Sequence, residues 1–436
     1  MTRIESKSGM LVGLAVLSLW LMNIVFGFIF NGITYYDFTA KIAVIAGASA
    51  LAMTLPLILF RITDYVEQNG HPRSSIKHTT RFFLCILCVL GYAIEMRAYG
   101  RSFGESLDAV RAEYLKNSAS ELQAGKIVYI AYLLKGFGII AWMMTLMDSP
   151  KLKHIIPVLG LLGLAVVIEA YSTGGRALFR LLIITGVGTI FCHHTNWVIR
   201  NLRKLALSGS AFVVAAFVAH EAFQDARRGS GALDASQNYE NERIGQLVLA
   251  SVGFESAPLW LVRFVCQPFL YIGTSISNFA LFYDNWDGST MFGTFSFPIV
   301  GSRFSSEHPS TVKQRVDEYN AAYGAEHNLW ATGLRDICID LSPYGIVVGC
   351  FVIGIAFIVL RRTYARYLGI RLLCIFAASW MLYSPLESLT RLGIEVSIYL
   401  SFLILLSEVF SSKLIRFEST THENKVRDGN GNPSLS

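Results

Sequence analysis

Five polar side chains gather just ahead of a long apolar run in the last third of the chain. They are His327, Asn328, Arg335, Asp336 and Asp340, within the stretch HNLWATGLRDICIDLSPYG (His327 to Gly345). The apolar run that follows, Ile346 to Leu360, is predicted to lie in a membrane. Polar groups at a bilayer boundary are costly unless they have partners or a function. The stretch is therefore the first candidate for a functional site.

A second candidate is the short turn STGGR, which ends at Arg176. Gly174 and Gly175 allow the backbone to approach a ligand closely, and free backbone amides there could help Arg176 to hold an anion. A guanidinium is always charged and binds phosphate through paired hydrogen bonds. Arg176 and Arg335 together indicate an anionic ligand at the membrane boundary, most simply a lipid-linked phosphate or pyrophosphate.

The composition sets the class of protein to which these residues belong. Hydrophobic residues make up 53% of the 436 residues and charged residues only 16%, with a mean hydropathy of +0.47. This is too apolar for a soluble domain and predicts an all-α polytopic membrane protein. The net charge of +6 lies in short basic clusters between apolar runs, as topology signals do. No nucleic-acid partner is implied.

The seven cysteines form neither a disulfide framework nor a metal-binding set, because most lie inside apolar runs. Cys85 and Cys88 have the spacing of a redox or zinc pair, but their neighbours are apolar. We interpret both as helix-packing residues. We also expect the apolar run that follows the first residues to be a retained helix and not a cleaved signal peptide.

Ten apolar runs approach the spanning length of about 20 residues. They are Met10 to Phe30, Ala40 to Phe60, Phe82 to Met96, Ile127 to Met147, Ile155 to Tyr171, Ala177 to Cys192, Leu205 to Phe223, Leu341 to Leu360, Leu372 to Tyr383 and Gly393 to Phe410. We expect one membrane domain over residues 1–410 and a disordered cytoplasmic tail over residues 411–436.

Basic residues cluster after the second, fourth, sixth and eighth runs, and this pattern marks those connections as cytoplasmic. They are Arg61, Arg73, Lys77, Arg81, Lys151, Lys153, Arg200, Arg203, Lys204, Arg361, Arg362, Arg366 and Arg371. Both termini then lie inside. The outer face receives two long segments, residues 97–126 and 224–334. An eleventh span over Leu259 to Ile276 is the alternative, which we disfavour because it would move the last basic cluster and the tail outside.

Ionisable residues in or beside the expected spans fall mostly toward the outer face. They include Glu95, Arg97, Glu169, Arg176, His220, Glu221, Arg335, Asp340, Glu387, Arg391 and Glu395, with Glu408 as an exception. Lys135 lies deeper in its span and its long stem can reach toward Glu169. Any one of these charges could simply anchor a helix end. As a set they predict a polar cavity that opens outward.

Three blocks of sequence, NLWATGLRDICIDLSPYG, FLYIGTSISNFALF and STGGRAL, resemble the Wzy-type polymerases of O-antigen and exopolysaccharide repeat units. The family pattern of Asn, aromatic, Thr, Arg, Asp and Gly is matched here by Asn328, Trp330, Thr332, Arg335, Asp340 and Gly345. The chain departs from it at Ser342 and Pro343, where the family more often continues the start of a helix.

The resemblance implies an inverting, metal-independent glycosyltransferase with a membrane fold of the GT-C type. Such enzymes join oligosaccharides carried on undecaprenyl pyrophosphate at the outer face of the bacterial cytoplasmic membrane. Arg176 and Arg335 are the candidates for stabilising the departing pyrophosphate, with Arg97 and Arg263 as weaker ones.

The remaining site candidates follow from the same chemistry. His327 is the candidate for assisting the proton transfer, because the unperturbed pKa of a histidine lies close to working pH; a solvated loop histidine is the alternative. Tyr271, Asn278, Asn328 and Trp330 are candidates for binding sugar, although interfacial aromatic residues are often only anchors. Asp340 completes the expected substrate-binding set.

The expected partners are the lipid-linked oligosaccharide, the bilayer and a chain-length regulator. No cofactor or metal is expected, since no Asp-x-Asp or Glu-x-Asp pair is present. Two other functions stay open: an O-antigen ligase, which transfers to lipid A core, and a transporter or flippase. A flippase would need polar groups in both halves of the membrane, which the outward bias disfavours.

Overall fold

The computed structural model describes most of the helical part of the chain. The described residues are 2–6, 8–29, 39–60, 62–66, 77–103, 105, 109–110, 126–148, 152–173, 177–201, 332–364, 366–386 and 394–411, with short pieces between 243 and 296. Helices dominate this part of the chain, and its only strands are β1 (Thr2–Ser6) and β2 (Ile62–Val66).

Six of the described helices are long and apolar enough to cross a membrane. They are α1 (Ser8–Ile29), α2 (Ala40–Leu59), α3 (His78–Ala98), α5 (Lys126–Asp148), α6 (Leu152–Thr173) and α14 (Gly333–Arg362). Two further helices, α7 (Ala177–His193) and α15 (Leu368–Tyr383), are apolar but shorter. The short α8 (Thr195–Arg200) follows α7, and a last helix covers residues 395–411. The chain is a helical, multi-pass membrane protein.

The helices lie at the positions of the expected spans wherever the structure describes them, except that α14 begins at Gly333 and not at Leu341. A helix covers each expected span except Leu205 to Phe223, which lies outside the described residues. Most of residues 224–334 and of the alternative span Leu259 to Ile276 also lies outside them, as does the tail beyond residue 411. The count of ten spans therefore remains a prediction.

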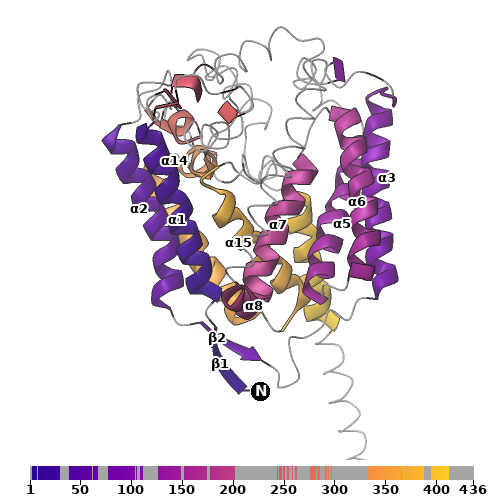
Figure 1. Ribbon diagram of the computed structural model, residues 1–436. Helices are drawn as coiled ribbons and strands as arrows, with labels where there is room; N and C mark the ends of the chain where they lie inside the picture. The colour runs from indigo at the N-terminus through magenta and orange to yellow at the C-terminus, as the bar shows by residue number, and fades with distance from the viewer. Residues whose placement is uncertain are drawn as a thin grey trace, which may run out of the picture.

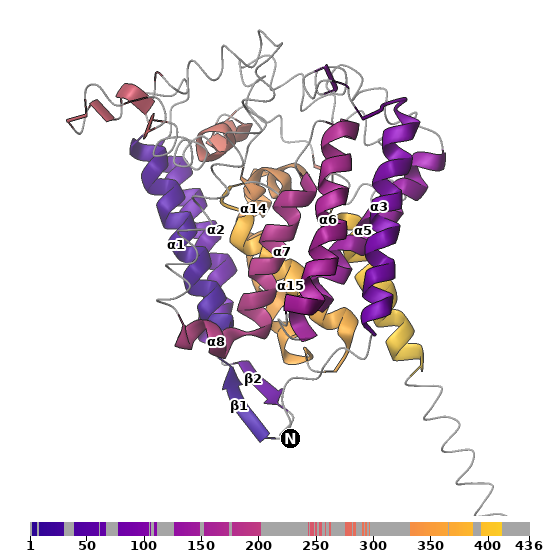
Figure 2. The ribbon, with the colours of Figure 1, turned by 45° about the vertical axis from the view of Figure 1, so that its right-hand side comes forward.

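Figures 1 and 2 show how the helices are arranged. The pair α1 and α2 forms one side of the bundle, α3, α5 and α6 form the other, and α7, α14 and α15 lie between them. Contacts join α14 to α2 and α15, and α15 to α7. The buried core includes Trp20, Met53, Ile140, Phe279 and Phe357.

Two ion pairs join the antiparallel helices α3 and α5. Arg81 in the first turn of α3 binds Asp148 at the end of α5, and Glu95 in the last turn of α3 binds Lys135 near the middle of α5. Between them, a Cβ on Gly91 would lie 2.7 Å from the Ala131 carbonyl oxygen, so a small residue is needed for this close approach. Arg81 was expected in a cytoplasmic loop, but the structure places it inside α3 with a buried side chain.

The cysteines that have redox spacing are part of the packing in this region. Cys85 and Cys88 on α3 are both buried and free. The sulfur of Cys88 lies close to Gly138 of α5. This confirms the interpretation of both as helix-packing residues.

A sharp kink divides α14. Ser342 has φ 69° and ψ 165°, and Pro343 follows it. Proline has no N–H to continue the helix, and it disfavours a helical conformation at the residue before it. The departure from the family pattern at these two residues therefore has a structural consequence, because the segment that carries Arg335 and Asp340 is a separate helical piece that starts at Gly333.

The two strands form a small antiparallel sheet at the end of the bundle where the chain begins (Figure 1). Thr2 pairs with Val66 and Ser6 with Ile62. The N-terminal segment and the connection that follows α2 must therefore lie at the same end of the bundle, as an even number of spans between them requires.

Candidate functional site at one end of the bundle

The start of α14 is fixed by backbone hydrogen bonds and carries a buried pair of charges. Gly333 N donates to the Ser384 carbonyl oxygen, 2.7 Å away, at the end of α15. Arg335 and Asp336 are each only 2% exposed, and Arg335 Nε lies 3.7 Å from Asp336 Oδ1. A guanidinium that is withdrawn from water in this way interacts strongly with any charge that approaches it.

Asp340 has backbone partners at both carboxylate oxygens. Gly293 N donates to Oδ1 at 3.0 Å and Ser296 N donates to Oδ2 at 3.1 Å. Met291 N also donates to the Ile339 carbonyl oxygen at 3.0 Å. Asp340 therefore ties a piece of the expected outer segment to α14. The structure shows Asp340 in this anchoring role, and the binding of substrate by Asp340 stays a prediction.

The block FLYIGTSISNFALF reaches the same turn as the start of α14. Ser275 Oγ donates to the Pro385 carbonyl oxygen at 2.9 Å, and Asn23 Nδ2 on α1 donates to both Ser275 Oγ and that carbonyl oxygen. Asn278 lies in the same short helical piece and is buried. Two of the three blocks thus meet at the turn that follows α15.

The third block, STGGRAL, joins α6 to α7. Leu178 N, at the start of α7, lies 3.2 Å and 3.1 Å from the two carboxylate oxygens of Glu169 on α6. A carboxylate at a helix N-terminus satisfies an amide that has no partner inside the helix and interacts favourably with the helix dipole. Glu169 therefore fixes the point at which α7 begins, immediately after Arg176.

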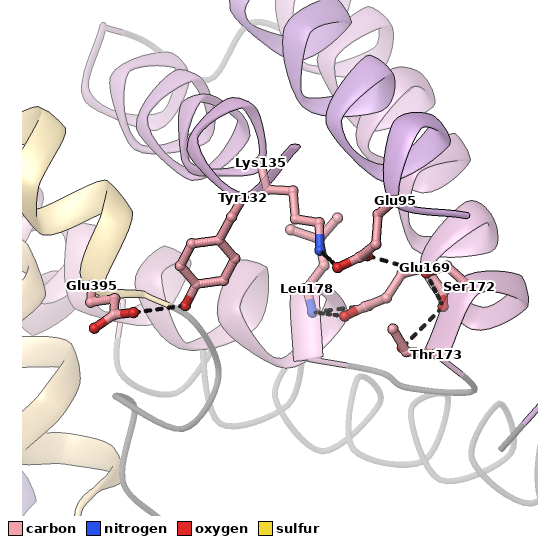
Figure 3. A network of polar contacts seen from close by, with 8 residues as sticks. All are labelled: Glu95, Tyr132, Lys135, Glu169, Ser172, Thr173, Leu178 and Glu395. Carbon is pink, nitrogen blue, oxygen red and sulfur yellow. Dashed lines mark hydrogen bonds and ion pairs between the residues drawn. The ribbon is translucent and has the colours of Figure 1, made fainter. Parts of the chain in front are cut away.

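Glu169 belongs to a network of buried polar side chains that Figure 3 shows. Lys135 on α5 binds Glu95 on α3, and Ser172 Oγ on α6 donates to Glu95 Oε2 at 3.3 Å. The ammonium of Lys135 also lies 4.6 Å from the centroid of the Tyr92 ring. The ion-pair partner of Lys135 is therefore Glu95 and not the expected Glu169.

The network continues from α5 to the last helix through a contact that the sequence analysis did not identify. Tyr132 Oη donates to Glu395 Oε1 at 3.0 Å (Figure 3). Nearby, Ser397 Oγ donates to the Gly136 carbonyl oxygen at 3.0 Å, where only a small residue lets the two helices approach closely. The sequence signal for Tyr132 was its spacing of three residues from Lys135, which places both on one helical face.

The other expected site residues fall in two groups. Arg97 lies in the last turn of α3 and is exposed. Six further candidates lie outside the described residues: Arg176, Arg263, Tyr271, His327, Asn328 and Trp330. Among the described candidates, Arg335, Asp340 and Asn278 belong to segments that are hydrogen-bonded to one another or to the same turn.

The site therefore offers a buried guanidinium at the start of α14 and a buried carboxylate network across α3, α5, α6 and the last helix. The first suits an anionic group, and the second suits hydrogen-bond donors or cations. Comparison with known proteins adds no assignment: no family model, no curated protein and no solved structure matches the chain.

Proposed function

We propose that the protein is a Wzy-type polymerase that joins oligosaccharide repeat units carried on undecaprenyl pyrophosphate. The observation that carries this proposal is the meeting of two sequence blocks at one turn. Ser275 and Gly333 are distant in sequence but bind the adjacent carbonyl groups of Pro385 and Ser384. Arg335 follows in the first turn of α14 and is buried. A site built from these blocks holds a guanidinium suited to a pyrophosphate.

In the proposed reaction, a hydroxyl group of one lipid-linked unit attacks the anomeric carbon of the sugar at the reducing end of the growing chain. A new C–O bond forms while the bond from that carbon to the pyrophosphate breaks. Undecaprenyl pyrophosphate leaves with the electron pair, and the hydroxyl proton passes to a base. Arg335 and Arg176 stabilise the departing charge, and His327 is the proposed base.

The proposal includes a definite membrane arrangement. The chain crosses the bacterial cytoplasmic membrane ten times in a fold of the GT-C type, and the start of α14 faces outward. Arg81, Arg361 and Arg371 then belong to the inner end of the bundle, in agreement with the positive-inside rule. The β1–β2 sheet lies at that inner end, with the N-terminus.

The direct test is reconstitution. Purified protein in lipid nanodiscs is incubated with the undecaprenyl-pyrophosphate-linked repeat unit isolated from cells of the source strain, and the products are separated by size. A ladder of saccharides on one lipid carrier is the expected result. A catalytically impaired variant such as Arg335→Ala, at matched protein abundance, serves as the control.

Other results would assign a different function. Transfer of a saccharide only when lipid A core is added would identify a ligase. Movement of the lipid-linked unit across proteoliposome membranes without any new glycosidic bond would identify a flippase. Either result would overturn the polymerase proposal.

A further inference from the structure

The polar network holds three buried carboxylates that differ in how they are balanced. Glu95 is paired with the ammonium of Lys135 and accepts a hydrogen bond from Ser172. Both oxygens of Glu169 lie within hydrogen-bond distance of the Leu178 amide at the start of α7. The first two carboxylates therefore have a charge or a helix N-terminus to stabilise them.

Glu395 is the first residue of the last helix, where the helix dipole favours a carboxylate, but among the described residues no cation and no backbone amide binds it. It is 5% exposed, and its hydrogen-bond donor is the neutral phenol of Tyr132, which contacts Oε1. Its other oxygen, Oε2, is buried and has no hydrogen-bond partner within the described part of the chain. A buried polar atom that is left without a partner is destabilising, so such an atom in a folded protein calls for an explanation.

The chemistry around Glu395 limits what could bind there. A phosphate would be repelled by Glu395 and by the network as a whole, in which the carboxylates of Glu95, Glu169 and Glu395 outnumber the ammonium of Lys135. Within the described residues, no three His, Cys, Asp or Glu side chains gather to hold a metal ion. A neutral donor fits, because the hydroxyl group of a sugar can donate one hydrogen bond to Oε2 without adding charge to a membrane-embedded site.

We propose that Glu395 Oε2 accepts a hydrogen bond from a hydroxyl group of the lipid-linked saccharide, and that Tyr132 positions the carboxylate for it. This inference rests on the proposed function and adds a sugar subsite to the pyrophosphate site at Arg335. The saccharide displaces contacts that cover Glu395 in this structure. Sugar and pyrophosphate are then bound by separate groups, of opposite charge.

The test compares two probes in nanodiscs. One is the undecaprenyl-pyrophosphate-linked repeat unit isolated from the source strain, and the other is undecaprenyl pyrophosphate that carries no sugar. We expect Glu395→Gln to weaken binding of the sugar-bearing probe by roughly ten- to a hundredfold, as for a hydrogen bond to a charged group. Binding of the sugar-free probe should not change. Tyr132→Phe should show the same selectivity with a smaller loss.

Two controls separate this role from a structural one. Ser401→Ala changes a buried residue on the same helix whose hydroxyl donates only to Ser397 one turn earlier, and it should alter neither affinity. Arg335→Ala should weaken both probes. Thermal unfolding of each variant identifies any that fails to fold, and Glu395→Asp, which keeps the charge, then serves as the second variant with the same expected selectivity.

The outcomes distinguish the inference from the proposed function. If wild-type protein binds both probes and Glu395→Gln binds them as wild type does, or loses both equally, the sugar subsite is wrong while the polymerase proposal stands. Wild-type protein that binds neither probe overturns both. A selective loss of the sugar-bearing probe supports the subsite even in a protein that transfers the saccharide to another acceptor.

Discussion

Arg335 differs from the exposed Arg97 in how completely it is withdrawn from water. Its side chain is 3% exposed and lies against Asp336, which is also buried. A guanidinium in such a place is held in one orientation, whereas an exposed arginine is mobile and screened by salt. If Arg335 binds the leaving pyrophosphate, the geometry of the group should matter as much as its charge.

The first prediction concerns that geometry. We expect Arg335→Ala to lower polymer turnover by roughly a hundredfold or more, as for the loss of one donor to a developing negative charge. Arg335→Lys should restore little of it, because lysine keeps the charge but loses the planar fork. Turnover is measured in the reconstituted assay at equal abundance of folded protein.

Salt dependence provides the control for Arg335. If the residue only attracted an anionic lipid at long range, lysine would restore most of the rate and high salt would reduce the difference between variants. Loss of folded protein in Arg335→Ala would instead indicate that Asp336 had been left as an unpaired buried charge. A well-expressed Arg335→Ala protein with near-normal turnover would remove α14 from the catalytic site.

The second prediction concerns divalent cations. We expect polymerisation to continue in the presence of a chelator, because the sequence contains no Asp-x-Asp or Glu-x-Asp pair to seat a cation at the pyrophosphate. The assay is run with the chelator alone and with magnesium or manganese restored. Activity that disappears and returns with the metal would contradict the prediction and direct attention to Glu240 and Glu242, two carboxylates separated by one residue in the expected outer segment.

Residue-level pairings were the hardest feature to predict from sequence. That Glu95, Glu169 and Glu395 lie toward the same end of the bundle could be predicted from their positions at the ends of apolar runs. The partner of Lys135 could not, since it depends on how α3, α5 and α6 are rotated about their axes. Hydropathy does not predict which face of each helix points toward its neighbours, because these helices are apolar around most of their circumference.

At the level of elements, the kink in α14 stores backbone strain. Ser342 adopts a combination of positive φ and extended ψ that is essentially restricted to glycine. Strained residues of this kind persist where the surroundings hold them, often at functional sites. Here the strain separates the piece that carries Arg335 and Asp340 from the apolar remainder of the helix.

The third prediction uses that strain. Ser342→Gly should stabilise the folded protein by about 1 kcal/mol, because glycine adopts this conformation without a Cβ clash. The stability is measured by thermal or denaturant unfolding in mild detergent. Ser342→Ala is the matched control and should give no gain, since alanine retains the Cβ. A destabilised Ser342→Gly protein would contradict the kinked geometry.

The fourth prediction concerns the pairing of α3 with α5. Arg81 and Asp148 have side chains that are 3% and 12% exposed. Removing one partner of a buried ion pair typically costs about 3–5 kcal/mol, because the other charge is left uncompensated. Asp148→Asn should therefore be strongly destabilising, as measured by unfolding in detergent.

The double variant Arg81→Met with Asp148→Leu is the control for this pair. It removes both charges and should be less destabilised than Asp148→Asn alone. If the double variant were instead more destabilised than Asp148→Asn, the ion pair would not contribute as the structure indicates.

Helix positions could be predicted because each apolar run is long and bounded by charged or small residues. The start of α14 was the exception. The sequence placed it at Leu341, where the apolar run begins, but the helix begins at Gly333. Burial of Arg335 and Asp336 against neighbouring helices allows a charged segment to be helical at this depth, and such tertiary contacts leave no signal in hydropathy.

For the whole molecule, the pairing of β1 with β2 sets one constraint on topology. It places the N-terminal segment and residues 62–66 at one end of the bundle. The start of α14 and the carboxylate network lie toward the opposite end of the bundle (Figure 2). If the basic clusters lie in the cytoplasm, the candidate site faces outward.

The last prediction tests this orientation. Reporter tags placed after residue 436 and within residues 67–76 should report a cytoplasmic location, and a tag near Ala232 should report the outer face. The physical reason is that Arg361 and Arg362 end α14, Arg366 follows it and Arg371 lies in the first turn of α15, so all four lie at the end that the basic residues mark as inside. An outward C-terminus together with an inward N-terminal connection would require an odd number of spans. That result would favour an eleventh span over Leu259 to Ile276, and it would place the basic cluster after α14 on the outside.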